Sequence, residues 1–138
     1  YQNRKQVVIH KLERFDGTVD LKDYIKSSDT NPEENFQKLL QIVDAMESQY
    51  LKQLILDVLN DPTIKPLFLL APAAKSIHHA KFGGLVEHIL SVCNLAQLVT
   101  QNYPDLNRDL LVYGAVFHDI GKIWELKIDE GGIQYTDK

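Results

Sequence analysis

The chain contains a single cysteine, Cys93, and therefore cannot form an internal disulfide bond. Such a low cysteine content is typical of proteins that work in a reducing cytoplasm, and we expect a cytoplasmic location. No apolar run approaches the length of a membrane-spanning helix, and the stretch "VIHKLERFD" does not have the pattern of a secretory signal peptide. These features argue against a disulfide-stabilised secreted protein and against a membrane protein.

The chain also lacks a strong excess of positive charge. Its net charge of −4 at pH 7 argues against a surface that coats nucleic acid in general, although a local basic groove is compatible with it. The 138 residues, of which 44% are hydrophobic and 25% charged, suit one soluble globular domain or part of a larger one. The chain begins at Tyr1 rather than at Met, as expected of a piece of a longer protein.

The apolar pattern predicts a mostly α-helical fold. Residues 6–12, "QVVIHKL", are expected to form a short strand that pairs with a sheet elsewhere, and the polar residues 16–32 to form a linker. Helical spacing of apolar residues extends from Phe36 to Met46 and continues from Leu51 to Leu59, with a break at 47–49. Prolines at 62, 66 and 72 permit only a short helix through "LFLLA".

Two longer helices are predicted next, over about 84–102 and 107–119. We expect them to pack together, with Gly114 on the inner face admitting a close approach. The end of the chain, "IWELKIDEGGIQYTD", alternates as two strands around Gly131–Gly132, which predicts a β-hairpin.

Two histidines fall on the predicted inner faces of these two helices, and an aspartate is adjacent to one of them. His88 shares a face with Leu85, and His118 follows Gly114 by four positions, with Asp119 beside it. A buried imidazole needs a hydrogen bond or a metal, since leaving it unpaired costs about 1–3 kcal/mol. Either histidine alone is compatible with a hydrogen-bonded core residue. Together with Asp119 they form a candidate metal site, provided that the chain leaves the helix near Gly121.

The mixed imidazole and carboxylate set suits Mn²⁺, with Mg²⁺, Fe or Co²⁺ as alternatives, better than it suits structural zinc, which favours thiolates. Cys93 has no second thiolate to act with, so we interpret it as a small core residue. His10 has no ionisable group placed to act with it, and we expect it at the surface.

The segments "GGLVEH" and "VFHDIGK" resemble the HD phosphohydrolase superfamily, which is named for its metal-binding His-Asp pair. The stretch "APAAKSIHHAKFGGLVEHILSV…YPDLNRDLLVYGAVFHDIGKIWEL" is more similar still to the YhaM-like 3′→5′ exoribonucleases, which join an OB-fold to an HD domain. The resemblance is strong over about 70–126. It implies a helical HD-domain-like bundle, in which 1–31 are the end of an upstream OB-like domain with its linker and 32–138 are a partial HD domain.

The resemblance also implies roles for individual residues. His88, His118 and Asp119 would be metal ligands, with one or two ions per complete site, and Asp119 would be catalytic. Lys122 matches the lysine of "HDIGK" and would contact a substrate phosphate, unless it is simply a solvated lysine. His78 and His79 match the "HH" of the ribonuclease branch and would contact substrate or support the ligands. A phosphate could also bind the amides at the Gly83–Gly84 helix start.

One departure from the superfamily pattern bears on activity. Superfamily members close the site with a further Asp on a later helix, whereas this chain has no histidine after His118 and its last aspartates fall in or beside the predicted hairpin. The resemblance therefore implies a metal-dependent phosphodiesterase, a 3′→5′ exoribonuclease on single-stranded RNA, whose 138-residue piece is inactive alone and self-associates as a homo-oligomer. The alternatives are an HD phosphohydrolase acting on nucleotides or cyclic dinucleotides, and a non-catalytic HD-type binding module.

Overall fold

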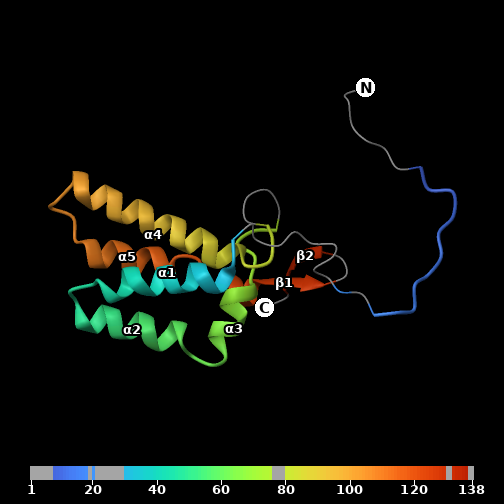
Figure 1. Ribbon diagram of the computed structural model, residues 1–138, viewed down its shortest axis with the longest axis horizontal. Coiled ribbons are helices and arrows are strands. Elements are labelled where there is room, and N and C mark those ends of the chain that lie inside the picture. The colour runs from blue at the N-terminus through green and yellow to red at the C-terminus, as the bar shows by residue number, and fades with distance from the viewer. Residues whose placement is uncertain (1–7, 19, 21–29, 76–79, 130–131, 137–138) are drawn as a thin grey trace, which may run out of the picture.

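Six helices and one β-hairpin make up the computed structural model, which describes residues 8–18, 20, 30–75, 80–129 and 132–136. The elements are α1 (Pro32–Asp44), α2 (Gln49–Leu59), α3 (Ile64–Leu70), α4 (Gly84–Asn102), α5 (Arg108–Phe117), α6 (Lys122–Glu125), β1 (Leu126–Asp129) and β2 (Gly132–Tyr135). The long helices lie side by side, with the hairpin at one end of the bundle (Figure 1). None of the helices in the described ranges has the length and apolarity that a membrane crossing requires.

The predicted helical character and the split between α1 and α2 are confirmed. Asn31 caps α1 by accepting a hydrogen bond from the amide of Glu33, and Pro32 occupies the first helical turn. Ser48, within the polar 47–49 break, caps α2 through the amide of Leu51. Local capping chemistry therefore sets these helix boundaries.

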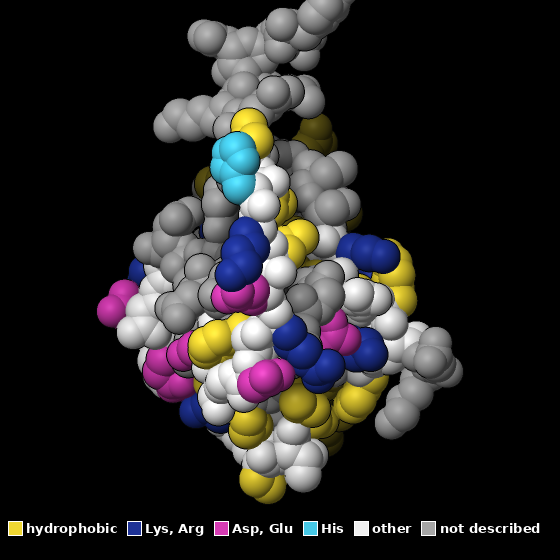
Figure 2. All heavy atoms as spheres, turned by 90° about the vertical axis from the view of Figure 1, so that its right-hand side faces the viewer, with side chains coloured by type: hydrophobic (Ala, Val, Ile, Leu, Met, Phe, Trp, Pro, Cys, Tyr) yellow, Lys and Arg dark blue, Asp and Glu magenta, His cyan; other side chains and the backbone are white. Residues whose placement is uncertain are grey.

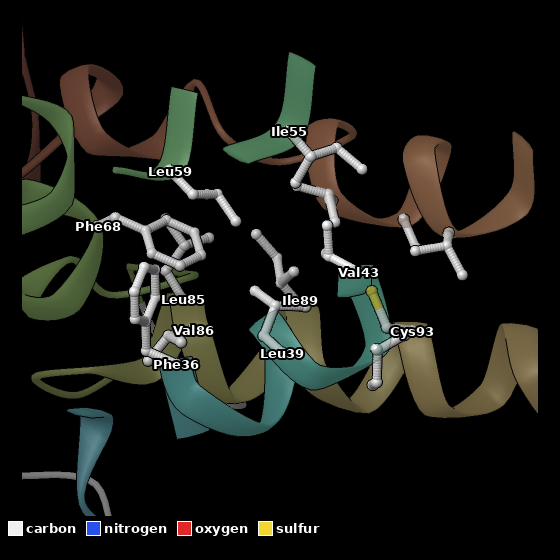
Figure 3. Packing of buried hydrophobic residues seen from close by; sticks show 14 of the residues in the cluster. Phe36, Leu39, Val43, Ile55, Leu59, Phe68, Leu85, Val86, Ile89 and Cys93 are labelled. Carbon is white, nitrogen blue, oxygen red and sulfur yellow. The ribbon is translucent and has the colours of Figure 1, made fainter. Parts of the chain in front are cut away.

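The core forms where α1, α2, α3, α4 and α5 meet. Phe36 and Phe68 pack edge to face with ring centroids 6.1 Å apart, and Leu85 and Ile89 of α4 are fully buried close to them (Figure 3). Cys93 is fully buried as well, and this burial raises the pKa of its thiol to about 12. The thiol therefore stays neutral, which agrees with the interpretation of Cys93 as a core residue.

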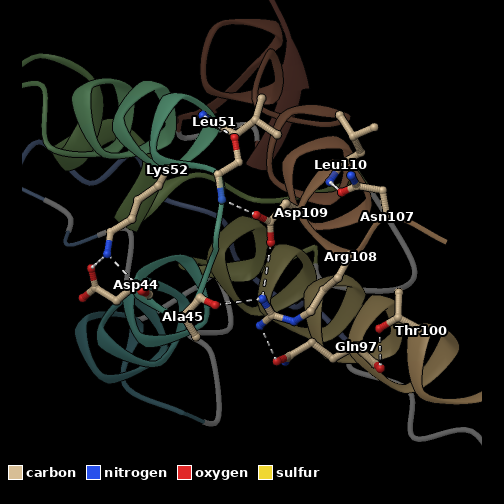
Figure 4. Close-up of polar contacts among 11 residues, drawn as sticks. Asp44, Ala45, Leu51, Lys52, Gln97, Thr100, Asn107, Arg108, Asp109 and Leu110 are labelled. Atoms are coloured by element: carbon tan, nitrogen blue, oxygen red, sulfur yellow. Dashed lines mark hydrogen bonds and ion pairs between the residues drawn. The ribbon is translucent and has the colours of Figure 1, made fainter. Parts of the chain in front are cut away.

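A polar latch joins the α1–α2 turn to the start of α5. The backbone amide of Ser48 donates to Oδ2 of Asp109 over 2.6 Å, and Arg108 donates to the carbonyl of Ala45 and to Oε1 of Gln97 over 3.2 and 3.0 Å (Figure 4). Asp109 is the one charged residue that is buried in the described part of the chain. The latch holds α5 against α1, α2 and α4 at the end of α5 opposite His118.

The structure corrects three predictions about backbone elements. Residues 8–12 form no strand and are exposed, because no described segment offers their backbone a hydrogen-bonding partner. Residues 122–125 form α6 rather than the start of a strand, so the hairpin begins only at Leu126, which pairs with Tyr135. Gly114 is exposed, and a Cβ there would meet nothing within 4 Å. The two helices instead meet through the buried Val112, Ala115 and Val116.

Candidate metal centre

The start of α4 and the end of α5 lie together at the hairpin end of the bundle (Figure 1). Gly83 lets α4 begin close against α1, because it precedes α4 with a left-handed φ of 71° and a Cβ there would come within 2.5 Å of Cγ of Pro32. Leu85 then donates its amide to the carbonyl of Ala71, which anchors the first turn of α4. His88 follows one turn later.

The predicted phosphate site at this helix start is wrong. The amides of Gly83, Gly84 and Leu85 already donate to the carbonyls of Leu70, Lys81 and Ala71 over 3.2, 3.0 and 2.9 Å. All three donor residues are also buried. These three amides are therefore committed to backbone partners and are not available to a phosphate.

His88, His118 and Asp119 converge, as the sequence predicts. The two Nε2 atoms lie 3.1 Å apart, and Oδ2 of Asp119 lies 3.5 Å from Nε2 of His88 and 3.6 Å from Nε2 of His118. Ligands that lie about 2.1 Å from one ion, at right or tetrahedral angles, are separated from each other by about 3.0–3.4 Å. The three atoms therefore form a triangle close to the size that a single divalent ion requires.

A hydrogen bond between the His118 ring and the backbone of Ala115 determines which ring nitrogen carries the proton. Nδ1 of His118 lies 2.8 Å from the carbonyl oxygen of Ala115, and a carbonyl can only accept. Nδ1 therefore carries the proton, and the lone pair of the neutral ring is on Nε2, which faces His88. Metal-binding histidines in proteins are commonly oriented by this kind of second hydrogen bond. Sequence reasoning did not identify Ala115, although its position three residues earlier in the last helical turn was a usable signal.

The three side chains are half-buried rather than in the core. The exposed fractions are 28% for His88, 39% for His118 and 27% for Asp119. The sequence expectation that both imidazoles point into the core is therefore wrong. The buried face of α4 runs through Leu85, Ile89 and Cys93. His88 therefore lies at the edge of that face, and His118 lies just beyond the last residue of α5, where solvent and a ligand reach them.

Helix α5 ends earlier than predicted, and tight turns rather than a left-handed glycine end it. The helix ends at Phe117, and Gly121 has a right-handed φ of −59° rather than a left-handed conformation. Bonds from Ile120 to Phe117 and from Lys122 to Asp119 tighten the chain into successive i→i+3 turns. These tighter turns bring Asp119 to the same side as His118, which a regular helix would not do.

Lys122 lies beside this cluster but is paired with a residue that sequence reasoning did not single out. Its Nζ lies 2.8 Å from Oε2 of Glu125. That hydrogen bond, and the nearby negative charges of Glu125 and Asp119, raise the pKa of Lys122. Lys122 is thus a fixed positive charge within electrostatic reach of the candidate ligands, rather than a freely solvated lysine. The i,i+3 spacing of Lys122 and Glu125 was the available sequence signal.

The remaining predicted site residues do not join the cluster in the described structure. His78 and His79 lie outside the described residues. His10 is exposed, as expected, and lies on the segment that precedes α1. Among the described residues, His88, His118 and Asp119 are the group whose donor atoms are close enough to hold a metal ion.

The geometry agrees with an independent comparison of the sequence with known families. A model of the HD domain family matches residues 85–135, a segment that contains all three converging side chains. The match supports a place in the HD superfamily, whose members include metal-dependent phosphohydrolases. No solved structure matches the chain significantly.

Proposed function

We propose that this protein is a metal-dependent phosphodiesterase of the HD superfamily and acts as a 3′→5′ exoribonuclease on single-stranded RNA. The observation that carries the proposal is the triangle of His88, His118 and Asp119, because two neutral imidazole nitrogens and one carboxylate suit a hard or borderline divalent ion. The match of the HD family model supports the reaction class, and the resemblance of the 70–126 stretch to YhaM-like proteins supports the substrate.

The donor set fits Mn²⁺ most naturally. His88 and His118 would each contribute Nε2, and Asp119 would contribute Oδ2. When bound, the ion supplies an activated water at neutral pH and stabilises charge on the phosphoryl oxygens. Ala115 holds the His118 ring in the orientation that directs Nε2 toward the cluster. Lys122 contributes a fixed positive charge that favours binding of the anionic phosphodiester.

Partial exposure of the three side chains favours a polymeric substrate. The site lies near the start of α4 and the end of α5, and its three side chains are partly exposed to solvent. A chain of nucleotides can therefore extend from the site into the solvent. The alternatives are hydrolysis of a nucleotide or cyclic dinucleotide, and binding of a ligand without catalysis. The experiment described next distinguishes these classes.

The activity is tested on the protein in the longest form that its gene encodes. Single-stranded RNA labelled at its 5′ end is incubated with Mn²⁺, and the products are separated at single-nucleotide resolution. A ladder that shortens from the 3′ end, and that disappears with Asp119→Ala but not with His10→Ala, is the expected result. Hydrolysis of only mononucleotides or cyclic dinucleotides would assign the alternative substrate class. Binding of any of these ligands without Mn²⁺-dependent hydrolysis would show a binding module.

A further inference from the structure

The hairpin places an exposed aromatic side chain beside α6, the short helix that follows the candidate metal ligands. Tyr135 ends β2, is 56% exposed and pairs with Leu126, the residue that directly follows α6. The next residue, Thr136, donates its amide to the carbonyl of Glu125 over 2.8 Å and its hydroxyl to the carbonyl of Trp124 over 2.6 Å. These bonds fix the end of β2 against α6, whose first residue is Lys122.

One lysine lies over the ring of this tyrosine, and a second is linked to the end of its strand. Nζ of Lys75, from the segment between α3 and α4, lies 5.7 Å from the centroid of the Tyr135 ring. Lys122 is linked to the same end of β2 through Glu125, whose carboxylate lies 2.8 Å from Nζ of Lys122 and whose carbonyl accepts the amide of Thr136. The end of β2 therefore connects Lys75, at the Tyr135 ring, with α6, the helix that Lys122 begins just after Asp119. At this end of the molecule, Lys and Arg side chains gather among acidic ones (Figure 2).

An exposed ring with one lysine over it and a second on the adjoining helix α6 matches the chemistry of single-stranded nucleic acid. Bases stack on aromatic side chains whatever their sequence, while lysines meet the phosphates on either side. The net charge of −4 does not oppose this arrangement, because binding depends on the local field and the distances involved are shorter than the Debye length of about 8–10 Å. The hydroxyl of Tyr135 is not needed for stacking.

We propose that Lys75, Tyr135 and Lys122 form a binding platform for single-stranded oligonucleotide, with a base stacked on Tyr135 and phosphates beside the two lysines. The platform rests on the proposed function, since it would deliver the strand to the metal centre, and it selects a polymer over a mononucleotide. Glu125 holds Lys122 through the 2.8 Å ion pair and therefore competes with a phosphate for it.

Oligonucleotide binding by the 138-residue chain, measured by fluorescence anisotropy in EDTA, tests the platform without requiring catalysis. A fluorescent single-stranded RNA of about ten nucleotides is the probe, with single-stranded DNA of the same sequence, an RNA duplex and a mononucleotide as comparisons. Binding of the single strands, in preference to duplex and mononucleotide, is expected. Equal affinity for the mononucleotide, or preference for the duplex, would overturn the platform.

Variants make the assignment specific. Tyr135→Ala is expected to weaken binding about tenfold, and Tyr135→Phe to retain it, because stacking requires the ring alone. The matched control is Tyr50→Ala, whose side chain is 91% exposed on α2 and should leave binding unchanged. Lys75→Ala should weaken binding and reduce its salt dependence by about one phosphate contact. The control is Lys38→Ala, at an exposed position on α1, which should change neither.

Glu125→Gln provides the sharpest test, because the platform predicts that this variant binds the oligonucleotide more tightly. Removing the competing carboxylate frees Lys122, and binding should tighten about threefold or more. Unchanged affinity in Tyr135→Ala together with no gain in Glu125→Gln would overturn the platform, even if Mn²⁺-dependent RNA cleavage is found. Conversely, the expected binding changes without any metal-dependent cleavage in the longest form would retain the platform and reject the proposed nuclease activity.

Discussion

The Nε2 atoms of His88 and His118 lie 3.1 Å apart, although 30 residues separate the two histidines along the chain. At this distance, the two Nε2 atoms can either form a hydrogen bond with each other or bind one cation together. The carboxylate of Asp119 lies within 3.6 Å of both nitrogens, which favours the cation. The pairing of α4 with α5 is therefore the feature of the fold from which the candidate chemistry follows.

Substituting a ligand should remove metal binding with little effect on folding. His118→Ala and Asp119→Ala are each expected to weaken Mn²⁺ binding at least about 10- to 100-fold, by analogy with the losses caused by outer-shell partners. Because both side chains are partly exposed, the free energy of unfolding should change by less than about 1 kcal/mol. Mn²⁺ titration followed by electron paramagnetic resonance, with urea unfolding in parallel, checks both expectations.

The control for these substitutions is His10→Ala, which removes an exposed imidazole outside the cluster. Mn²⁺ binding should be the same in this variant as in the wild type. Equal Mn²⁺ affinity in wild type, His118→Ala and Asp119→Ala would show that the ion binds elsewhere, and the assignment of the cluster would fall.

Breaking the polar latch should destabilise the fold. The side chain of Asp109 is only 9% exposed and accepts the amide of Ser48 over 2.6 Å. Asp109→Ala leaves that amide without its acceptor, which costs about 1–3 kcal/mol in the free energy of unfolding. Asp105→Ala, at an exposed position a few residues away, is the control and should change it by less than about 0.5 kcal/mol. Equal urea midpoints for the two variants would show that the latch contributes nothing.

The same change, glycine to alanine, should have opposite effects at two positions. Gly83 has a φ of 71°, and its Cβ would meet Cγ of Pro32 at 2.5 Å, so Gly83→Ala should cost more than about 1 kcal/mol. Gly114 lies in an exposed part of α5 with open space around it, and Gly114→Ala should stabilise by about 0.5–1 kcal/mol. Thermal unfolding of both variants measures the contrast, and a destabilising Gly114→Ala would indicate that this surface is covered in solution.

Sequence reasoning identified the helices and the candidate ligands because these depend on local patterns. Phe36, Leu39 and Val43 repeat at helical spacing and are buried, while the "HDIGK" and "VEH" segments carry their chemistry in adjacent letters. Sequence reasoning failed for features that depend on how the helices pack against one another. Whether Gly114 is buried depends on the rotation of α5, and "IWE" is too short for its periodicity to distinguish a strand from a helical turn.

The wider surroundings of the site could not be predicted from the sequence for a related reason. Lys75 and Tyr135 are 60 positions apart, and the sequence patterns assign no role to either residue. Only the hairpin register and the bonds from Thr136 to α6 bring the tyrosine toward Lys122. No sequence pattern marks the docking of β2 on α6, whereas the i,i+3 pair of Lys122 and Glu125 was visible.

The last prediction concerns the strength of metal binding by these 138 residues. The described structure brings together three protein donor atoms, whereas Mn²⁺ and Mg²⁺ prefer about six, so water must complete the shell. A single carboxylate also neutralises only half of the charge of a divalent ion. The dissociation constant for Mn²⁺ should therefore be about 0.1 mM or weaker, in the range of sites with few charged ligands, and RNA turnover by this chain alone should be absent. The exposed leucines of α4 and α5, Leu95, Leu98 and Leu110, further favour self-association, which sedimentation would detect. Calorimetric titration with Mn²⁺ and an RNA cleavage assay on the same sample make the comparison. Micromolar affinity accompanied by robust turnover would show that these three residues form a complete site, and that no further carboxylate is needed.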